Sequence, residues 1–133
     1  MATTWAAPPA ARPGLLIRFG RVLTAFKLKG LALHVFRALA RRDPACGEAW
    51  NCIGFILTER RRLEEALDAF DRVRALAPND AAAQFNAAFV LQRLGRRAEA
   101  IEGLRRALTL DPSLERARAA LQRSEAQEQI GTD

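Results

Sequence analysis

The fold is decided by residues 50–78, which read WNCIGFILTERRRLEEALDAFDRVRALAP. Gly54 and Ala66 are small residues set among large apolar ones at helical spacing. Pro78 ends the stretch, because proline lacks the N–H and clashes with the preceding turn of a helix. The basic run 60–62 is expected in a solvated turn between two helical segments. The stretch therefore predicts a helical hairpin.

The same pattern recurs on both sides of this stretch with a fixed period. Pro44, Pro78 and Pro112 are spaced 34 and 34 apart. Counted back from each proline, four further columns each hold one size class. They are Gly20, Gly54 and Ala88; Leu23, Leu57 and Leu91; Ala32, Ala66 and Ala100; and Phe36, Phe70 and Leu104. A period of this length indicates helical hairpins stacked in an array.

The size classes suggest how each hairpin packs. Small side chains should lie where two antiparallel helices approach closely, and large apolar ones should fill the space on either side. Polar residues beside the prolines can cap the helix that follows, and a glycine can cap the end of a helix. The predicted N-caps are Asp43, Asn79 or Asp80, and Asp111 or Ser113, and the predicted C-cap is Gly95.

The middle unit resembles the tetratricopeptide repeat (TPR) signature in both spacing and residue type. The residues that carry the resemblance are Trp50, Ile53, Gly54, Leu57, Ala66, Phe70 and Pro78. The third unit has Gln84 in place of the aromatic residue. The first unit has Leu16 there, and Gly30 in its inter-helix region. The resemblance covers about residues 13–112 and implies a solenoid of hairpins.

We therefore predict an all-α protein, an α-solenoid of three helical-hairpin (TPR) repeats plus a C-terminal capping helix. The abundance of alanine, 27 residues of 133, also favours helix. Leu114, Ala117 and Leu121 give the last segment one apolar stripe, as a solvating cap requires. The predicted boundaries are a flexible segment at 1–12, an array at 13–128 with repeats at about 13–46, 47–80 and 81–114 and a cap helix at 113–128, and a tail at 129–133.

The composition argues against chemistry of the chain's own. Cys46, Cys52 and His34 are the only cysteines and the only histidine, too few for a structural zinc site. No partner motif lies near any candidate nucleophile. We expect no enzymatic activity, no metal and no cofactor. Because residues 1–11 lack the basic start of a secretory signal, we also expect a cytoplasmic protein.

The resemblance implies that the first helix of each hairpin lines a concave groove, where family members hold an extended peptide or a short helix of a partner. Phe55 and Phe89 lie 34 residues apart and should stand side by side there, with Phe85 completing a solvent-facing ladder. The alternative is that these rings pack between hairpins as core. The predicted groove residues are Asn51, Phe55, Glu59, Phe85, Asn86, Phe89, Gln92 and Arg93.

One binding mode known in the family is a clamp on a partner's C-terminal carboxylate, built from two lysines, an arginine and two asparagines. An arginine and an asparagine do occur among the five corresponding places of this chain, but not at the places that require them. No place therefore has its required residue type, and this mode is disfavoured. Small three-repeat chaperones of bacterial secretion systems, with an apolar concave face, are closer in character. The five places hold Ile17, Arg21, Cys52, Ala82 and Asn86.

The positive charge is concentrated at the start of the chain. The net charge is +6, and residues 1–42 carry eight basic groups and no acidic one. Nucleic acid or an anionic membrane surface is therefore the alternative partner of this third. The scarcity of aromatic residues beside basic ones disfavours nucleic acid.

The first unit also has an apolar stripe that faces outward. Val22 corresponds to Ile56 and Val90, which should pack against a preceding hairpin, but the first unit has no predecessor. Three occupants remain open: a lid formed by Trp5, Pro8 and Pro9; a second copy, giving a homo-oligomer; and another partner or an anionic surface. The predicted contact edge consists of Leu15, Arg18, Arg21, Val22 and Phe26.

Together these patterns predict a noncatalytic protein–protein interaction module, acting as an adaptor, a chaperone or an assembly factor. Its groove would bind a segment of a protein or peptide partner. The sequence does not identify that partner.

Overall fold

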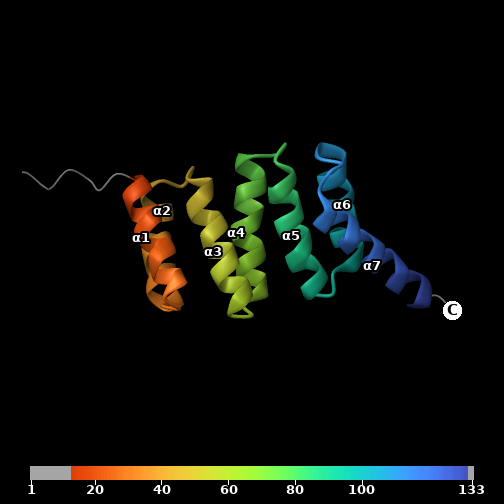
Figure 1. The fold of residues 1–133 in the computed structure, drawn as a ribbon, viewed down its shortest axis with the longest axis horizontal. Coiled ribbons are helices and arrows are strands. Elements are labelled where there is room, and N and C mark those ends of the chain that lie inside the picture. Colours follow the sequence, from red (N-terminus) through yellow and green to blue (C-terminus); the bar gives the residue numbers. More distant parts are fainter. Residues whose placement is uncertain (1–12, 132–133) are drawn as a thin grey trace, which may run out of the picture.

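The computed structural model describes residues 13–131, and every regular element in that range is an α-helix. The helical pairs follow one another in a row, with α1 and α7 at opposite ends (Figure 1). Among them none is both long and apolar enough to cross a bilayer. Their bounds are α1 Pro13–Ala25, α2 Lys29–Arg42, α3 Gly47–Glu59, α4 Leu63–Leu76, α5 Ala81–Arg93, α6 Arg97–Leu110 and α7 Glu115–Gly131.

Consecutive helices pair as the hairpins α1–α2, α3–α4 and α5–α6, and α7 packs on α6. The predicted all-α array of three hairpins and a cap helix is confirmed. The predicted cap bounds are wrong, because α7 starts at Glu115 and the expected tail at 129–133 is helical as far as Gly131. The segment 1–12, where a flexible end was predicted, lies outside the described residues.

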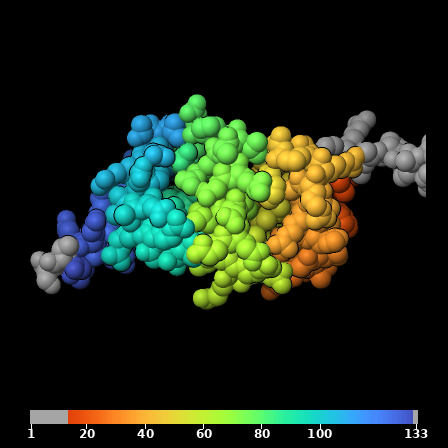
Figure 2. All heavy atoms as spheres, turned by 180° about the vertical axis from the view of Figure 1, so that it is seen from behind, coloured from red at the N-terminus to blue at the C-terminus, as the bar shows by residue number. Residues whose placement is uncertain are grey.

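The interior is continuous along the row. One cluster of buried apolar side chains runs from α1 to α6, and a second joins α5, α6 and α7. The side of the molecule seen in Figure 2 is covered mainly by α2, α4 and α6, whose colours run from orange through yellow-green to cyan. The first helices of the hairpins, α1, α3 and α5, each pack against one of these second helices.

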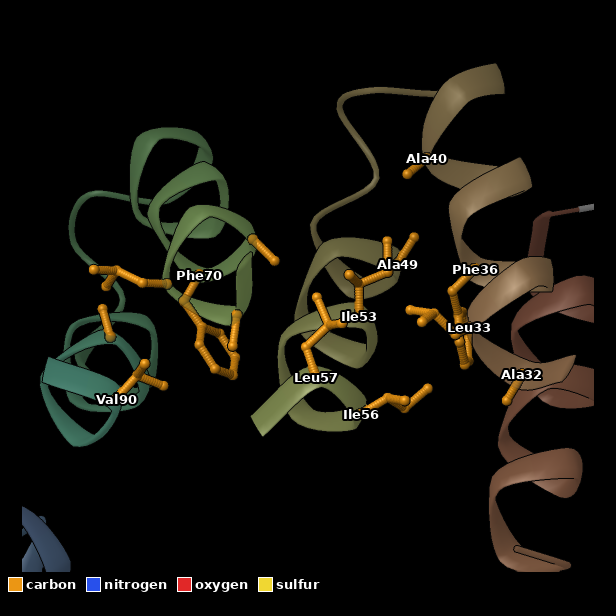
Figure 3. Packing of buried hydrophobic residues seen from close by; sticks show 14 of the residues in the cluster. Ala32, Leu33, Phe36, Ala40, Ala49, Ile53, Ile56, Leu57, Phe70 and Val90 are labelled. Carbon is orange, nitrogen blue, oxygen red and sulfur yellow. The ribbon is translucent and has the colours of Figure 1, made fainter. Parts of the chain in front are cut away.

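Inside each hairpin, a small residue on the first helix makes room for a large one on the second. A Cβ atom added to Gly20 would lie 2.6 Å from the Phe36 ring, and one added to Gly54 would lie 2.6 Å from the Phe70 ring. Figure 3 shows the Phe70 ring between the helices. The glycines thus accommodate a ring rather than a facing backbone, which corrects the expected role of this column.

The third hairpin solves the same packing problem with a different pair. Ala88 stands in the glycine column and Leu104 in the phenylalanine column, and both are fully buried. Ala88 has one methyl group more than glycine, and Leu104 is correspondingly smaller than phenylalanine, so the space between the helices stays filled. The size classes read from the sequence therefore describe complementary pairs.

The prolines that separate the hairpins share a second feature. The Trp50 indole N–H donates to the carbonyl oxygen of Pro44 at 2.9 Å, and the Gln84 side-chain amide donates to that of Pro78 at 3.2 Å. Arg118 donates in the same way to Pro112. These three donors are themselves 34 residues apart, so the third unit replaces the aromatic residue without losing the bond.

The predicted N-caps hold at one position of three. Asp80 caps α5 by accepting the Ala82 N–H at 2.9 Å. Asp43 and Asp111 instead accept from Ala45 and Ser113, at 3.2 and 3.0 Å, and so close the turns ahead of α3 and α7. The N–H groups that they accept from lie two residues before the helix and not in its first turn, because each carboxylate forms a turn within its own loop.

Candidate functional site

A hollow in the described surface lies between α1 and α3. It has a volume of about 470 Å³ and a mostly apolar lining. Its polar edges come from charged groups on both helices, and its floor includes Ile56, which is buried. The lining residues are Arg21, Thr24, Ala25, Glu48, Asn51, Cys52, Phe55, Ile56 and Glu59.

The charged residues that line the hollow on α3 are paired with basic groups of the first hairpin, Arg21 on α1 and Lys29 at the start of α2. Arg21 lies 3.6 Å from Glu48, and Lys29 lies 2.7 Å from Glu59. Each pair joins the first hairpin to α3. Because the four side chains are exposed, the pairs contribute little to stability. They do neutralise the rim, so no single charge dominates the hollow.

Cys52 lies in the wall of this hollow and is not set up as a nucleophile. Burial and, secondarily, the nearby Glu48 carboxylate raise the pKa of the Cys52 thiol to about 11. Because the thiolate is the reactive form, the thiol is protonated and unreactive near neutral pH. Cys52 therefore contributes an apolar surface to the hollow.

Two asparagines join α3 to α5 at the middle of the groove. The Asn86 side-chain N–H donates to Asn51 Oδ1 at 3.2 Å. This bond does not use the Asn51 NH₂ group or the Asn86 carbonyl oxygen. One amide donor and one amide acceptor thus stand where they could pair with the backbone of an extended peptide.

A second, narrow hollow of about 50 Å³ continues the groove from α3 toward α5 and α7. The Phe55 ring meets the Phe70 ring edge-on, with centroids 5.4 Å apart. Arg93 stacks on Phe89, with its guanidinium carbon 4.9 Å from the ring centroid. The lining residues are Phe55, Thr58, Phe70, Phe85, Asn86, Phe89 and Arg116.

The predicted ladder of three solvent-facing phenylalanines is wrong at Phe85. Its side chain is only 7% exposed and lies in the cluster shared by α5, α6 and α7. The cause is α7, which covers it and places Arg116 over its ring at 5.3 Å. Gln92 is also engaged, because its amide donates to the Ala120 carbonyl at 3.2 Å and to Ser124.

Of the predicted groove residues, the structure brings Asn51, Phe55 and Glu59 together around the first hollow. It brings Phe55, Phe85, Asn86 and Phe89 together around the second, where Phe85 is a buried part of the wall. Sequence reasoning missed Thr24 and Thr58, whose signal was their separation of 34 residues. Their hydroxyls donate to the carbonyls of Gly20 and Gly54, at 2.9 and 2.7 Å.

The predicted N-terminal contact edge divides into two parts. Leu15, Val22 and Phe26 are exposed apolar residues at the free side of α1, and Arg18 is exposed beside them. Arg21 instead turns toward α3, where it pairs with Glu48 and lines the first hollow. The edge is therefore an apolar stripe with Arg18 at its flank.

No cluster of metal-binding side chains occurs in the part of the chain that the structure describes. Between residues 13 and 131, no three His, Cys, Asp or Glu side chains gather closely enough to hold an ion. What the arrangement offers is an apolar, partly amide-lined groove along the first helices of the hairpins.

A stack of hairpins with this period and this groove is the architecture of tetratricopeptide repeat proteins, and the chain belongs to that family: the tetratricopeptide repeat family model matches residues 46–113. Membership makes it a protein-interaction module, and repeat proteins of this type are generally noncatalytic scaffolds.

Individual proteins resemble the chain in sequence or in fold. The chain is 30% identical over 102 residues to the peroxisomal targeting signal receptor of Kluyveromyces lactis. The matched region makes up 77% of this chain but only 18% of the receptor. The crystal structure of MamA matches with a TM-score of 0.83 at 20% identity, over 90% of this chain and 70% of MamA. The secretion chaperone SycD of Yersinia enterocolitica, in complex with a peptide of the translocator YopD, matches with a TM-score of 0.81 at 19% identity, over 86% and 93% of the two chains.

Proposed function

We propose that this protein is a noncatalytic adaptor, chaperone or assembly factor that holds an extended segment of a partner protein along the groove formed by α1, α3 and α5. The observation that carries the proposal is the Asn51–Asn86 pair, which lies between the apolar hollow and Phe89. Apolar side chains with a few placed polar groups are typical of binding sites.

The two parts of the groove suit different parts of a peptide. The hollow of about 470 Å³ has the size of a ligand pocket and an apolar lining, which fits a large apolar side chain. The unused amide groups of Asn51 and Asn86 fit the peptide backbone. Phe55 and Phe89 flank the asparagines and would cover the segment from both sides.

The charges of the first hollow favour an internal segment there over a free C-terminus. A carboxylate in this hollow would need an unpaired basic group, but Arg21, the basic residue of its lining, is already paired with Glu48. The structural likeness to SycD, whose structure holds a peptide of its translocator, supports a groove of this kind.

The test uses a random-peptide library selected on the full chain, followed by anisotropy titration of a selected peptide. Asn51→Ala, Phe55→Ala and Phe89→Ala should each weaken binding by about fivefold or more, equivalent to ~1 kcal/mol, as expected of residues at the centre of an interface. Helicity and melting temperature should stay close to those of the wild type.

The matched control is Phe19→Ala. Phe19 and Phe55 are both half-exposed phenylalanines on first helices, at 52% and 50%, but only Phe55 lines the groove. Phe19→Ala should leave the affinity unchanged. A selected peptide that loses affinity with Phe19→Ala and keeps it with Phe55→Ala would place the binding site elsewhere and refute the proposal.

A further inference from the structure

The free side of α1 is built like the joints inside the array. In α3, α5 and α7, the side that faces the preceding hairpin carries Ala49, Ala83 and Ala117, which are all buried. Figure 3 shows Ala49 and Ile56 on the side of α3 that faces Leu33 and Phe36 of α2. Counted back by one period, the residue of α1 in the alanine column is Leu15, which is exposed.

Two further columns repeat this contrast. Val22 is 50% exposed, whereas Ile56 and Val90 in the same column are 2% and 0% exposed. Phe19 is half-exposed, whereas Ile53 and Ala87 in its column are buried. The stacking positions of α1 are therefore all apolar, although no helix of the described chain lies beyond α1 (Figure 1).

The difference between the first hairpin and the other two is clearest at the start of the second helix. In hairpins two and three the start of the second helix carries the ion pairs Arg62–Glu65 and Arg96–Glu99, at 2.7 and 2.8 Å. Glu65 also lies 3.4 Å from Arg37 of the preceding hairpin, so its column faces backward along the array. In the first hairpin, the same two positions hold the half-exposed residues Leu28 and Leu31.

These residues form one apolar surface, which we name the end face. Since the columns of Leu15, Phe19 and Val22 are buried against a preceding helix at the internal joints, this part of the end face has a shape that fits a helix. An exposed surface of this kind marks an interaction site. The end face consists of Leu15, Phe19, Val22, Phe26, Leu28 and Leu31.

The charge around the end face restricts its occupant. No acidic residue occurs before Asp43, so Arg18 and Lys27 adjoin the end face without a counter-charge from α1 or α2. Glu48 and Glu59 of α3 are paired with Arg21 and Lys29 of the first hairpin. Two copies meeting through this surface would bring like charges together, whereas an acidic partner would complement them.

We propose that the end face docks an acidic amphipathic helix of a partner protein as one further layer of the stack. The partner's apolar stripe would cover Val22 and Phe19, and its carboxylates would pair with Arg18 and Lys27. This site is separate from the groove, so the chain could hold two different segments at once.

The probe is a helix-stapled peptide that copies residues 63–76, because α4 packs against α5 at an equivalent joint and carries four acidic residues against two arginines. Its comparison peptide has the four carboxyls replaced by amides. At low salt the acidic peptide should bind the full chain at least about tenfold more tightly than its amide form. Arg18→Glu should abolish that preference.

Variants separate the end face from the rest of the surface. Val22→Glu combined with Phe19→Glu should remove binding, with helicity unchanged by circular dichroism. Leu110→Glu, at an exposed leucine on α6, and Phe55→Ala in the groove should both bind as the wild type does. Failure of the groove proposal would leave these results unchanged.

Four outcomes would overturn the proposal. The first is equal binding of both peptides, and the second is loss of binding with Phe55→Ala. The third is a concentration-dependent dimer that Val22→Glu dissociates, which would assign the end face to a second copy. The fourth is binding of phosphatidylserine vesicles without binding of either peptide, which would assign it to a membrane surface.

Discussion

The hairpins α1–α2 and α3–α4 have the same interior and opposite outer surfaces. Gly20 receives the Phe36 ring as Gly54 receives the Phe70 ring, at the same distance of 2.6 Å. On the side toward the chain start, however, α3 buries Ile56 against α2 while α1 exposes Val22. The residues that close a hairpin and those that stack it on its neighbour are therefore separate sets, and only the second set changes its environment at the end of the array.

The largest expected effect tests this separation with one substitution at equivalent positions. Ile56→Glu places an unpaired carboxylate inside a joint and should lower the free energy of unfolding by about 3 kcal/mol or more. Val22→Glu places the same group in solvent and should change it by no more than about 0.5 kcal/mol. Urea unfolding followed by circular dichroism measures both.

The comparison has an internal control in Val90→Glu, which lies one period further on and is fully buried. It should behave like Ile56→Glu. Similar large losses for Val22→Glu would show that the end face is already covered, and the distinction between the two hairpins would then be lost.

A second prediction exchanges the internal pair of the second hairpin for that of the third. In the presence of Phe70, Gly54→Ala should destabilise the chain by about 1 to 2 kcal/mol, because the added methyl group overlaps the ring and the strain exceeds the gain in helix propensity. In the Phe70→Leu background, the same Gly54→Ala change should stabilise it by up to about 1 kcal/mol.

The sign reversal is measured as a double-mutant cycle on melting and urea curves. Phe70→Leu alone should cost about 1 kcal/mol through the space that it leaves. If Gly54→Ala has the same effect in both backgrounds, the ring does not occupy the glycine site and the proposed complementarity of the two columns is wrong.

The repeat explains how much of this structure could be predicted. Periodic prolines, glycines and phenylalanines specify local packing, so the hairpins and their order follow from the sequence. The position of Phe85 does not, because the helical wheel gives only its direction on α5. What buries it is α7, whose small residues Ala117 and Ala120 allow a close approach. That contact depends on the angle of the last helix, which no spacing encodes.

Only part of the groove could be predicted, because the period specifies which residues share a column but not which side chains of different columns meet. Phe55 and Phe89 share a column, so their common side followed from the period. The pairing of Arg21 with Glu48 joins different hairpins and different columns, and it could not be anticipated from either. Because that pair removes Arg21 from the end face, the sequence alone overestimated the positive charge there.

The smallest expected effect concerns the turn inside each hairpin. Lys27 and Arg61 have φ of 60° and 59°, and Gly95 in the same column has φ of 78°. Each turn closes with the same two bonds, for example Arg61 N–H to the Thr58 carbonyl at 3.1 Å and Arg62 N–H to the Leu57 carbonyl at 2.9 Å. This left-handed position after a helix strains any residue with a Cβ atom and suits glycine.

We therefore expect Lys27→Gly and Arg61→Gly each to raise the free energy of unfolding by about 0.5 to 1 kcal/mol, and Gly95→Ala to lower it by about 1 kcal/mol. Arg61→Ala serves as the control, because it removes the charge and keeps the strain, and it should have little effect. Differential scanning calorimetry resolves changes of this size.

If Arg61→Ala stabilises the chain as much as Arg61→Gly, the gain comes from relieving charge repulsion in the run 60–62. If only glycine stabilises it, backbone strain is a shared property of the two turns that lack glycine, and in this respect the first hairpin resembles the second more than the third.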